Sequence, residues 1–420
     1  MKVLFIVNEC NPEWASVPLL GYFFFDALSQ LADITLVTHE RNKQALEKVR
    51  GKRDIQYIKE NIVVSAYYKH MSRYVLNKWN NWPLHHMLSY PVYAEFNQKV
   101  YNQFNEDVIG GKYDIVHALT PILPRYPVKI HKACGEKTPF IIGPVNGGLP
   151  FPKSFGDVAK KEAVHFNFLR YFSRLLPGYK ATYQKANTIL AGSSYTLKLL
   201  REMLSIHSNK LKLFFENGIL SEFISRKDIE AVHSKNTPFH LLFVGRLVPY
   251  KGADMIISAL GDMELDVKEK LLLTIVGDGP EKTNLQKQVT DLHLEKQVRF
   301  TGWIEHHKTV EYYRNADVFC FPSIREFGGA VVLEAMATGL PCIVADHGGI
   351  SEYVTEETGI KINPVSREYI IRGIRNGVEC LMNNPQLHRN LSESAILRAG
   401  EFEWSKKAKQ IVSIYQKALM

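Results

Sequence analysis

The stretch DVFCFPSIREFGGAVVLEAMATGLPCIVADHGGISEYV, residues 317–354, decides the fold. A short apolar run predicts a buried strand, a loop with Glu326, Gly328 and Gly329 follows, and AVVLEAMAT has the pattern of a helix. The first amides of a helix lack partners within the helix and form an anion site. Glu334 lies a turn or so inside this helix, several Å from its start at about 1.5 Å rise per residue. The spacing therefore predicts a phosphate near the helix start with a carboxylate on either side.

Two further loops also follow predicted strands and are also interpreted as ligand-binding loops. In FVGRLVPYKG (243–252) a predicted strand is followed at once by Arg246 and then by Lys251. Two cations at the exit of a strand suit an anionic, phosphorylated ligand, Arg as a fork and Lys as a point charge. In IVGDGP (275–280) glycines such as Gly277 let the backbone approach a ligand closely. Taken alone, each of these two loops is also compatible with ordinary surface turns.

Short β-rich runs alternate with helical stretches throughout, which predicts an α/β fold with parallel sheets. Two sheets fit the runs better than one, and two facing Rossmann-like domains would form a cleft at the carboxyl ends of their strands. The predicted strands are 3–8, 34–39, 114–119, 140–145 and 188–193 in the first half and 240–246, 271–277, 298–302, 317–323, 342–346 and 359–364 in the second.

Composition describes a globular chain of 420 residues with 45% hydrophobic residues, which rules out disorder, collagen and coiled coil. The five scattered cysteines form no C-x-x-C pair, which favours a reducing, cytoplasmic setting. No apolar run approaches the roughly 18 residues of a membrane span, and MKVLFIVNE is better explained as a first strand than as a signal peptide.

The net charge of +9 lies entirely in residues 1–185, since 186–420 are balanced. Within the first half, 153–185 and 67–82 mix basic with aromatic and aliphatic residues. Such segments either pack as surface helices on the core or lie on an anionic membrane surface, and both alternatives stay open. Nucleic acid is not expected as a partner, because no recognised binding motif accompanies the charge.

Glu326 and Glu334 form an E-x7-E pair in a segment that resembles the signature of the family 4 retaining glycosyltransferases, part of the glycosyl transferases group 1. The resemblance extends over most of the second half in family order: VGRLVPYKG, VGDGP, VRFTGWI, NADVFCFPS, EFGGAVVLEAMATGLPCIVAD and GGISEYV. It is thinner in the first half, where DIVHAL, FIIGPVNGG, ILAGSSYT and ENGI carry it. The resemblance implies the GT-B fold of two facing Rossmann-like domains with an interdomain cleft. The expected bounds are 1–215 for an acceptor-side domain, 216–400 for a nucleotide-sugar-binding domain and 401–420 for a helix that crosses back to the first domain.

Residue by residue, the resemblance implies that Arg246 and Lys251 bind the donor diphosphate and neutralise charge as the nucleotide leaves. It implies that Glu326 holds the transferred sugar and that Glu334 takes the ribose hydroxyls. His117, in DIVHAL, matches a family histidine near the reacting carbon and completes the implied catalytic set with Glu326, Arg246 and Lys251. The other implied donor contacts are Phe327, Gly328, Gly329, Ala330 and Val331 at the sugar and diphosphate, and Gly302, Trp303 and Ile304 at the base.

The first loop, NECNPEWASVPLLG (8–21), lacks the paired glycines that many family members place against the diphosphate. Ser16 and Gly21 are therefore the candidates there. The further cleft candidates are Asn146, Gly147 and Gly148 in GPVNGG, and Gly277.

The implied function is retaining transfer of a hexose-type sugar from a nucleotide sugar, UDP-linked first and GDP-linked next, to a glycan or lipid-linked acceptor in surface polysaccharide or glycolipid biosynthesis. No cofactor and no metal ion are expected: charge stabilisation at the phosphates suffices, and the chain contains no D-x-D and no H-E-x-x-H. The paired histidines at 85–86 and 306–307 are interpreted as surface residues. The expected location is the cytoplasm, and a peripheral position at the inner face of the membrane is the further alternative.

Two alternatives remain, a sugar-nucleotide epimerase of GT-B-like fold and a non-catalytic glycosyltransferase partner subunit. An epimerase would need no acceptor and would release no free nucleotide. A partner subunit would bind donor without turnover. A dinucleotide-dependent dehydrogenase is disfavoured, because no predicted strand is followed by G-x-G-x-x-G.

Overall fold

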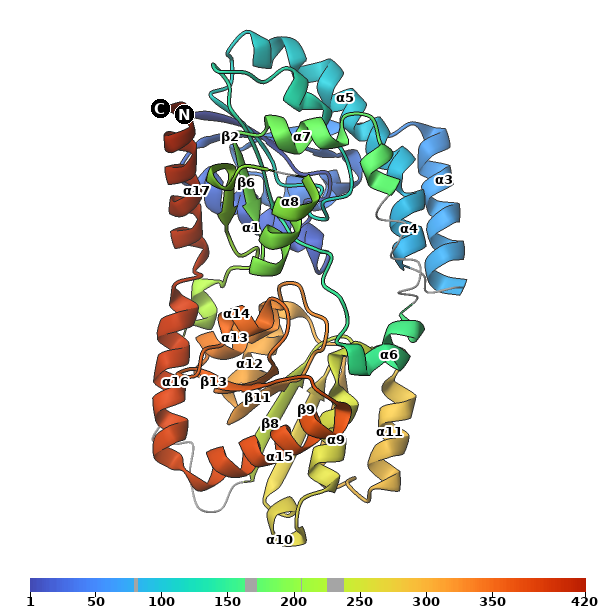
Figure 1. The fold of residues 1–420 in the computed structure, drawn as a ribbon, viewed down its shortest axis with the longest axis vertical. Helices are drawn as coiled ribbons and strands as arrows, with labels where there is room; N and C mark the ends of the chain where they lie inside the picture. Colours follow the sequence, from blue (N-terminus) through green and yellow to red (C-terminus); the bar gives the residue numbers. More distant parts are fainter. Residues whose placement is uncertain (79–81, 163–171, 205, 225–237) are drawn as a thin grey trace. The chain divides into compact units, whose positions relative to one another are not determined.

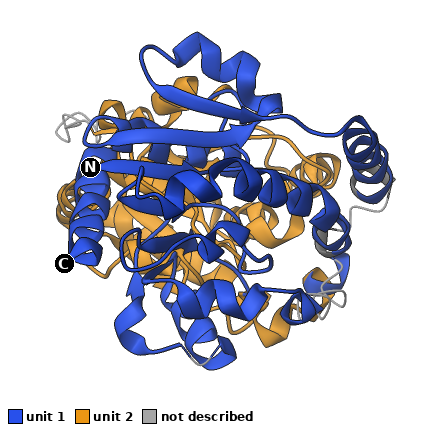
Figure 2. Ribbon diagram, turned by 90° about the horizontal axis from the view of Figure 1, so that it is seen from above, with its two compact units in different colours: residues 1–148, 159–216, 404–420 blue, residues 149–158, 217–403 orange. Residues whose placement is uncertain are grey.

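A computed structural model describes residues 1–78, 82–162, 172–204, 206–224 and 238–420. They form two compact units, coloured separately in Figure 2. The first unit comprises 1–148, 159–216 and 404–420, and the second comprises 149–158 and 217–403. Residues 149–158, which the sequence bounds assigned to the first domain, thus lie in the second unit.

The first unit contains a parallel sheet of seven strands in the order β3-β2-β1-β4-β5-β6-β7. Figure 1 labels two of these strands, β2 and β6. Its strands are β1 (Lys2–Ile6), β2 (Asp33–His39), β3 (Asp54–Ile58), β4 (Ile115–Ala118), β5 (Phe140–Val145), β6 (Thr188–Ala191) and β7 (Leu211–Leu213). Its helices are α1 (Val17–Ser29), α2 (Lys43–Val49), α3 (Ile62–Ser72), the π-helical η2 (Arg73–Lys78), α4 (Trp82–Leu88), α5 (Tyr90–Ile109), α7 (Tyr179–Lys185), α8 (Ser194–Leu204) and α17 (Trp404–Leu419). Helix α6 (Gly156–Lys161) contains the boundary between the two units.

The second unit contains a parallel sheet of six strands in the order β10-β9-β8-β11-β12-β13. Its strands are β8 (Phe239–Val244), β9 (Leu271–Val276), β10 (Val298–Gly302), β11 (Val318–Phe321), β12 (Cys342–Ala345) and β13 (Gly359–Ile362). Its helices are α9 (Ala253–Gly261), α10 (Leu265–Lys268), α11 (Lys282–Asp291), α12 (Thr309–Arg314), α13 (Ala330–Ala337), α14 (Ile350–Tyr353), α15 (Arg367–Asn383) and α16 (Pro385–Gly400).

Each strand order reverses once, between β1 and β4 in the first unit and between β8 and β11 in the second. Because right-handed crossovers change direction at such a point, helices cover both faces of a doubly wound sheet. In the second unit α9 packs with α11 and α15, and α13 packs with α12, α14 and α16. The α/β fold class predicted from the sequence is thereby confirmed.

The strands form where the sequence has continuous apolar runs, as expected for sheets covered on both faces. Every strand of β8 to β13 corresponds to a predicted run, and in the first unit β1, β2, β4, β5 and β6 do. The sequence analysis missed β3 and β7, which are the two edge strands. DIQYI at β3 alternates polar and apolar residues, and LKL at β7 is too short to give a pattern.

Helix starts follow local capping chemistry. The side chains of Asn61, Ser366 and Asn384 accept hydrogen bonds from backbone amides at the starts of α3, α15 and α16. These bonds satisfy amides that the helix itself leaves without a partner. None of the described helices is long and apolar enough to cross a membrane.

The last helix, α17, packs on α1 within the first unit. Lys407 of α17 is buried, and its Nζ donates to the carbonyl of Phe215 at 2.5 Å and lies 4.1 Å from the ring centroid of Phe214. Burial lowers the pKa of Lys407 to about 7, partly offset by the nearby Glu216 carboxylate. The amine therefore binds a proton less readily in the folded protein than in the unfolded chain.

This difference predicts a pH-dependent cost of burying Lys407. The cost is fully present below pH about 7 and disappears as pH rises towards the ordinary lysine pKa of about 10.4, because the unfolded chain binds the extra proton between these values. In Lys407→Met the cost is absent. The free energy of unfolding of the variant minus that of the wild type should therefore fall by roughly 2–4 kcal/mol between pH 7 and pH 10 in urea titrations. The exposed Lys409→Met is the control, and an equal trend in both variants would contradict the assignment.

Candidate functional site

The candidate site lies at the carboxyl edge of the sheet in the second unit. β8 and β11 are neighbours there, at the point where the strand order reverses. Arg246 follows β8 and Glu326 follows β11. Open α/β sheets bind ligands at such switch points, so the two loops that the sequence singled out are brought to one place.

Lys251 and Glu326 form an ion pair across these loops. Lys251 ends the short helix η9 (Pro249–Lys251), and its Nζ lies 2.6 Å from Oε2 of Glu326. The Lys251 ammonium also lies 4.8 Å from the ring centroid of Phe321, and the hydroxyl of Ser323 lies 3.5 Å from the same carboxylate oxygen. Both charged side chains are largely buried, so water screens their attraction less than at an open surface.

Arg246 is exposed, in contrast to Lys251. Within the described part of the chain its guanidinium has no ion-pair or hydrogen-bond partner. Its backbone is fixed, because the amide of the next residue, Leu247, donates to Asp278 and the Arg246 carbonyl accepts from Val248. An anchored backbone with a free guanidinium fork is suited to binding an anion.

Glycines let the loops after β8, β9 and β10 approach each other closely. A Cβ atom at Gly277, where φ is +141°, would lie 1.9 Å from the carbonyl oxygen of Gly245. The Gly277 amide in turn donates to the carbonyl of Gly302 at 2.9 Å. Trp303 follows and is 69% exposed, and Ile304 is half-buried. The predicted base residues Gly302, Trp303 and Ile304 therefore lie beside Gly277 at the same sheet edge.

The loop after β11 leads into α13 through Gly329, which adopts φ +67°. The amide of Val332 donates to the Gly329 carbonyl, and those of Ala330 and Val331 stand at the helix start. The loop is supported from the β12 side: the Gly349 amide donates to the Glu326 carbonyl at 2.9 Å. The predicted strand, glycine loop and helix are thus all present.

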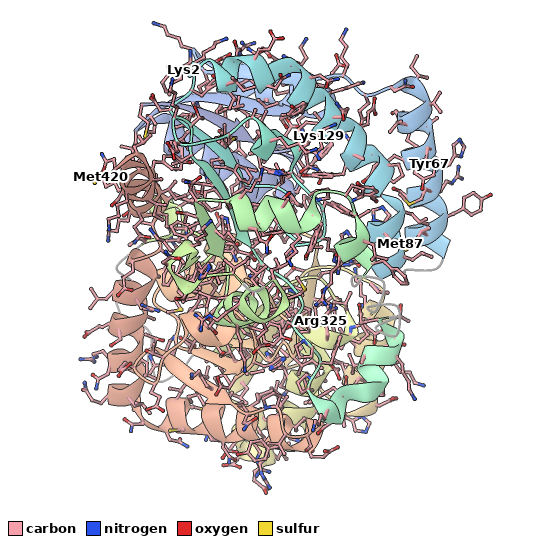
Figure 3. All side chains as sticks on the ribbon, turned by 45° about the horizontal axis from the view of Figure 1, so that its top comes forward. Lys2, Tyr67, Met87, Lys129, Arg325 and Met420 are labelled. Carbon is pink, nitrogen blue, oxygen red and sulfur yellow. The ribbon has the colours of Figure 1, made fainter. Side chains whose placement is uncertain are left out.

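Arg325 is a neighbour of the site that the sequence analysis did not select. Arg325 is labelled in Figure 3. Its guanidinium carbon lies 5.0 Å from the ring centroid of Phe151 and 5.4 Å from that of Phe327. Its Nε donates to the carbonyl of Leu149. These contacts attach the segment 149–158 to the glutamate loop within the second unit. The sequence could have pointed to Arg325 through its position next to Glu326 in the loop that follows a predicted strand.

Glu334 is buried one turn into α13, with both carboxylate oxygens engaged. Tyr313 donates its hydroxyl to Oε2 at 2.8 Å, and Nε2 of His306 lies 2.9 Å from Oε1. The hydrogen bond to Glu334 raises the pKa of His306, which favours its charged form. His306 is therefore a partner of the candidate site, although 39% of its side chain remains exposed. The adjacent His307 is exposed.

In the other histidine pair, the interpretation as a surface residue is wrong for His85. His85 is buried, and its Nε2 lies 3.0 Å from the hydroxyl of Ser72. Burial lowers the pKa of His86 to about 3. The ring of His85 belongs to the packing between α3 and α4, whereas His86 is half-buried. In the described part of the chain no group of three or more His, Cys, Asp or Glu side chains is arranged to hold a metal ion.

His117 does not have the open position that the resemblance implied. The residue is fully buried in β4, with Nδ1 2.5 Å from the hydroxyl of Tyr415 and Nε2 2.6 Å from the carbonyl of Gly143. Burial lowers the pKa of His117 to about 4, so the ring is neutral near pH 7. In this structure the imidazole joins β4, β5 and α17, and neither nitrogen is available to a substrate.

The remaining candidates in the first unit surround other strand exits. The buried Asn146 accepts hydrogen bonds from Ser193 and Thr196, and the Gly147 amide donates to the Thr196 hydroxyl. Ser16 precedes α1 with φ 69°. Gly148 has φ +84°. At Gly21 a Cβ atom would lie 2.7 Å from the carbonyl oxygen of Glu9. Packing and loop geometry account for Asn146, Gly147 and Gly21.

Comparison with known proteins matches residues 224–398 to the family of glycosyl transferases group 1. A D-inositol 3-phosphate glycosyltransferase from Corynebacterium glutamicum is 30% identical over 191 residues, which are 43% of this chain and 45% of the relative. The match thus spans less than half of that curated relative.

Solved structures extend the similarity over the whole chain. The structure of HepE from Anabaena in complex with UDP has a TM-score of 0.67 at 18% identity, covering 99% of this chain and 100% of that one. The apo lipopolysaccharide outer core galactosyltransferase WaaB has a TM-score of 0.66 at 16% identity, with the same coverage. The resemblance to glycosyl transferases group 1 is confirmed for the second half, and the fold is that of the GT-B proteins.

The buried contact of His117 predicts a structural effect. Tyr415→Phe removes the hydroxyl and leaves Nδ1 of His117 without its hydrogen-bond partner in the core. We expect the free energy of unfolding to fall by about 1–3 kcal/mol. Tyr369→Phe, at an exposed position of α15, is the matched control and should stay within about 0.5 kcal/mol of wild type. Equal stability of Tyr415→Phe and wild type would mean that this contact is not formed in solution.

Proposed function

From the match of residues 224–398 to the glycosyl transferases group 1, we propose that the protein is a retaining glycosyltransferase. It moves a hexose-type sugar from a nucleoside-diphosphate sugar to a glycan or lipid-linked acceptor in surface polysaccharide or glycolipid biosynthesis. One observation carries the proposal: Arg246, which is exposed and has no partner among the described residues, lies with the Lys251–Glu326 ion pair at the switch point of the matched domain. Cations and a carboxylate at one sheet edge suit a ligand with a diphosphate at one end and hydroxyls at the other.

In the proposed complex Arg246 binds the donor diphosphate from its exposed position. Lys251 turns from Glu326 to the phosphates, and Glu326 then accepts hydrogen bonds from the hydroxyls of the sugar. The amides of Phe327, Gly328 and Gly329, with those of Ala330 and Val331 at the helix start, complete the sugar and phosphate site. This exchange of partners keeps the buried charges compensated both before and after the donor binds.

Glu334 binds the ribose hydroxyls in this proposal. Its two oxygens each accept one hydrogen bond, from His306 and from Tyr313, whereas an ionised carboxylate offers about four lone-pair sites. Two hydroxyls can therefore be added without breaking the present contacts. The base lies against the backbone of Gly302, Trp303 and Ile304, next to Gly277.

Cleavage of the bond between the anomeric carbon and the diphosphate builds negative charge on the leaving phosphate. Arg246, Lys251 and the start of α13 stabilise that charge without a metal ion. The acceptor attacks from the face from which the nucleotide departs, so the anomeric configuration is retained. His117 takes no part in this step, because its ring is enclosed in the first unit.

A UDP-linked donor is favoured over a GDP-linked one. The Anabaena HepE structures are described as complexes with UDP and with UDP-glucose, which supports uracil as the base. The rival readings differ in their products: an epimerase would give a second nucleotide sugar, and a non-catalytic partner subunit would give none.

We place the protein in the cytoplasm, at an anionic membrane surface. The five cysteines are free, as expected in a reducing compartment. Along α3 and η2 the side chains of Val63 and Tyr74 are 73% and 60% exposed, Tyr67, labelled in Figure 3, is also exposed, and Arg73 stands beside them. Residues 62–78 contain no Asp or Glu. An apolar and basic strip of this kind suits a lipid surface. The other basic segment is 153–185, and its residues 163–171 lie outside the described residues.

Arg246→Ala tests the donor site without disturbing a contact that folding needs. The purified protein, with EDTA and no added metal, is incubated with UDP-, GDP- and ADP-sugars, and thermal stabilisation and released nucleotide are measured. UDP-sugars should stabilise the wild type and release UDP. In Arg246→Ala donor affinity should fall roughly tenfold to a hundredfold, the equivalent of about 1.5–3 kcal/mol. Arg299→Ala, exposed on β10, is the control.

The same panel separates the rivals. Conversion of the donor without free UDP would favour the epimerase, and binding without turnover in the presence of acceptors would favour the partner subunit. Activity that requires a divalent cation would contradict metal-independent transfer.

Vesicle co-sedimentation tests the membrane surface. The wild type should bind phosphatidylglycerol-containing vesicles and not phosphatidylcholine alone, and binding should weaken with salt. Arg73→Ala should lower the affinity about fivefold, since one basic residue near the surface is worth about 1 kcal/mol. Arg201→Ala on α8 is the matched control. Equal binding to both lipids, or an equal loss in both variants, would count against this strip.

A further inference from the structure

His306 is an ionisable group beside the candidate site that the proposed transfer step does not use. It begins the short helix η10 (His306–Lys308), four residues after the end of β10. Its Nε2 lies 2.9 Å from Oε1 of Glu334, and its ring centroid lies 5.5 Å from that of the buried Phe223 of η7 (Ser221–Phe223). Because 39% of the side chain remains exposed, the ring is held in place and can still exchange a proton with water.

Two elements fix the orientation of the Glu334 carboxylate. His306 holds Oε1 from η10, and Tyr313 donates its hydroxyl to Oε2 from α12 at 2.8 Å. Since the two partners engage different oxygens, the carboxylate cannot rotate about its terminal bond without losing one of them. Glu334 is buried, so water replaces a lost partner poorly. The direction in which the remaining lone pairs of Glu334 point therefore depends on His306.

The surroundings of the ring favour its protonated form. The hydrogen bond to Glu334 has the largest effect and raises the pKa of His306, burial lowers that pKa, and the charges of Glu334 and of the nearby Glu222 raise it again. Burial and Glu334 hold the pKa of Tyr313 well above its usual range, so Tyr313 stays a neutral donor. Among the described residues, the other ionisable groups on the elements packed against the ring or on its own loop are Glu311, Tyr312 and Arg314 of α12, and Glu305, His307 and Lys308, of which the last two pair with Glu305.

The protonation state of His306 changes the net charge next to the proposed ribose position. A protonated ring and the Glu334 carboxylate sum to zero, so an anionic diphosphate donor meets no net charge there. When the ring loses its proton, the carboxylate is uncompensated and repels the diphosphate. A neutral imidazole also has two tautomers, and only one of them donates from Nε2. Both effects weaken the donor site as His306 deprotonates.

We propose that His306 is a positioning residue of the donor site: it orients Glu334 towards the ribose hydroxyls and offsets its charge, so that the donor binds most tightly while His306 is protonated. This role rests on the proposed function, because it requires a nucleotide sugar whose ribose binds Glu334. His306 acts through Glu334 and needs no contact with the donor.

Calorimetry with UDP and 2′-deoxy-UDP tests the positioning role, and the guanine pair replaces them if the sugar panel selects GDP. Wild type should prefer the ribonucleotide about tenfold, since the missing hydroxyl loses a hydrogen bond to a carboxylate. In His306→Ala this preference should fall to about twofold, because Oε1 has lost the partner that orients it. His306→Gln keeps an N–H donor and should restore the preference, and the exposed His307→Ala is the matched control. A purely structural role would weaken both ligands equally and leave the preference unchanged, which would overturn the proposal.

The pH profile of UDP-glucose binding tests the charge. The diphosphate diester of this ligand stays fully ionised near neutral pH, so the ligand does not titrate. Wild-type affinity should fall roughly threefold to fivefold as pH rises through the pKa of His306, which ring NMR signals follow independently. His306→Gln carries no charge at any of these pH values and should lack this decline. An equal decline in wild type and His306→Gln, or none in wild type, would contradict the role of the charge.

The outcomes separate this role from the proposed function. Wild type that binds UDP with the same ribose preference as His306→Ala would refute the role of His306 and leave the transferase standing. Wild type that binds neither UDP nor GDP would refute both. In turnover, His306→Ala should raise KM with little change in kcat, because the ribose contacts are the same in the ground state and in the transition state.

Discussion

Burial of parallel strands on both faces is the constraint on which this structure depends. Strands such as β8 and β11 are continuous apolar runs, and helices cover both sides of their sheets. Charged side chains are therefore excluded from the sheet faces and collect where the strands end. Arg246, Lys251 and Glu326 in the second unit, and Arg41 and Glu60 in the first, all follow strand ends. The fold concentrates the chemically useful residues at an edge because its core has no other place for them.

Close backbone approach then determines how tightly that edge is built. The loops after β8, β9 and β10 meet at Gly245, Gly277 and Gly302, where a side chain at the middle position would overlap a carbonyl. On the other side of the switch point, Gly349 supports the loop of Glu326. The side chains that approach the ligand are thus carried on backbones with little freedom to move, which is what binding of a defined ligand geometry requires.

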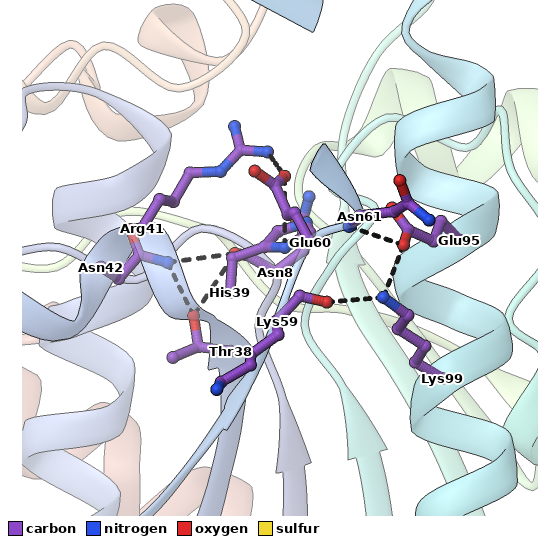
Figure 4. Close-up of polar contacts among 10 residues, drawn as sticks. All are labelled: Asn8, Thr38, His39, Arg41, Asn42, Lys59, Glu60, Asn61, Glu95 and Lys99. Carbon is purple, nitrogen blue, oxygen red and sulfur yellow. Dashed lines mark hydrogen bonds and ion pairs between the residues drawn. The ribbon is translucent and has the colours of Figure 1, made fainter. Parts of the chain in front are cut away.

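Buried charges in the second unit are compensated in pairs. Lys251 neutralises Glu326, and His306 with Tyr313 occupies Glu334. An unpaired buried charge is expensive, so these side chains pair with one another inside the protein. Arg246 needs none, because it is exposed. In the first unit Arg41 and Glu60 compensate each other in the same way (Figure 4).

The sequence by itself determined the fold class, all the central strands and the loop that carries Glu326, because apolar runs and glycine-rich turns are encoded locally. It also indicated family and donor-site residues through motif spacing. It did not reveal the edge strands β3 and β7, whose patterns are weak or short. Nor did it show that His117 is enclosed by Gly143 and Tyr415, or that His306 reaches Glu334. Those partners are 26 to 298 residues apart in the chain, and only tertiary packing decides such contacts.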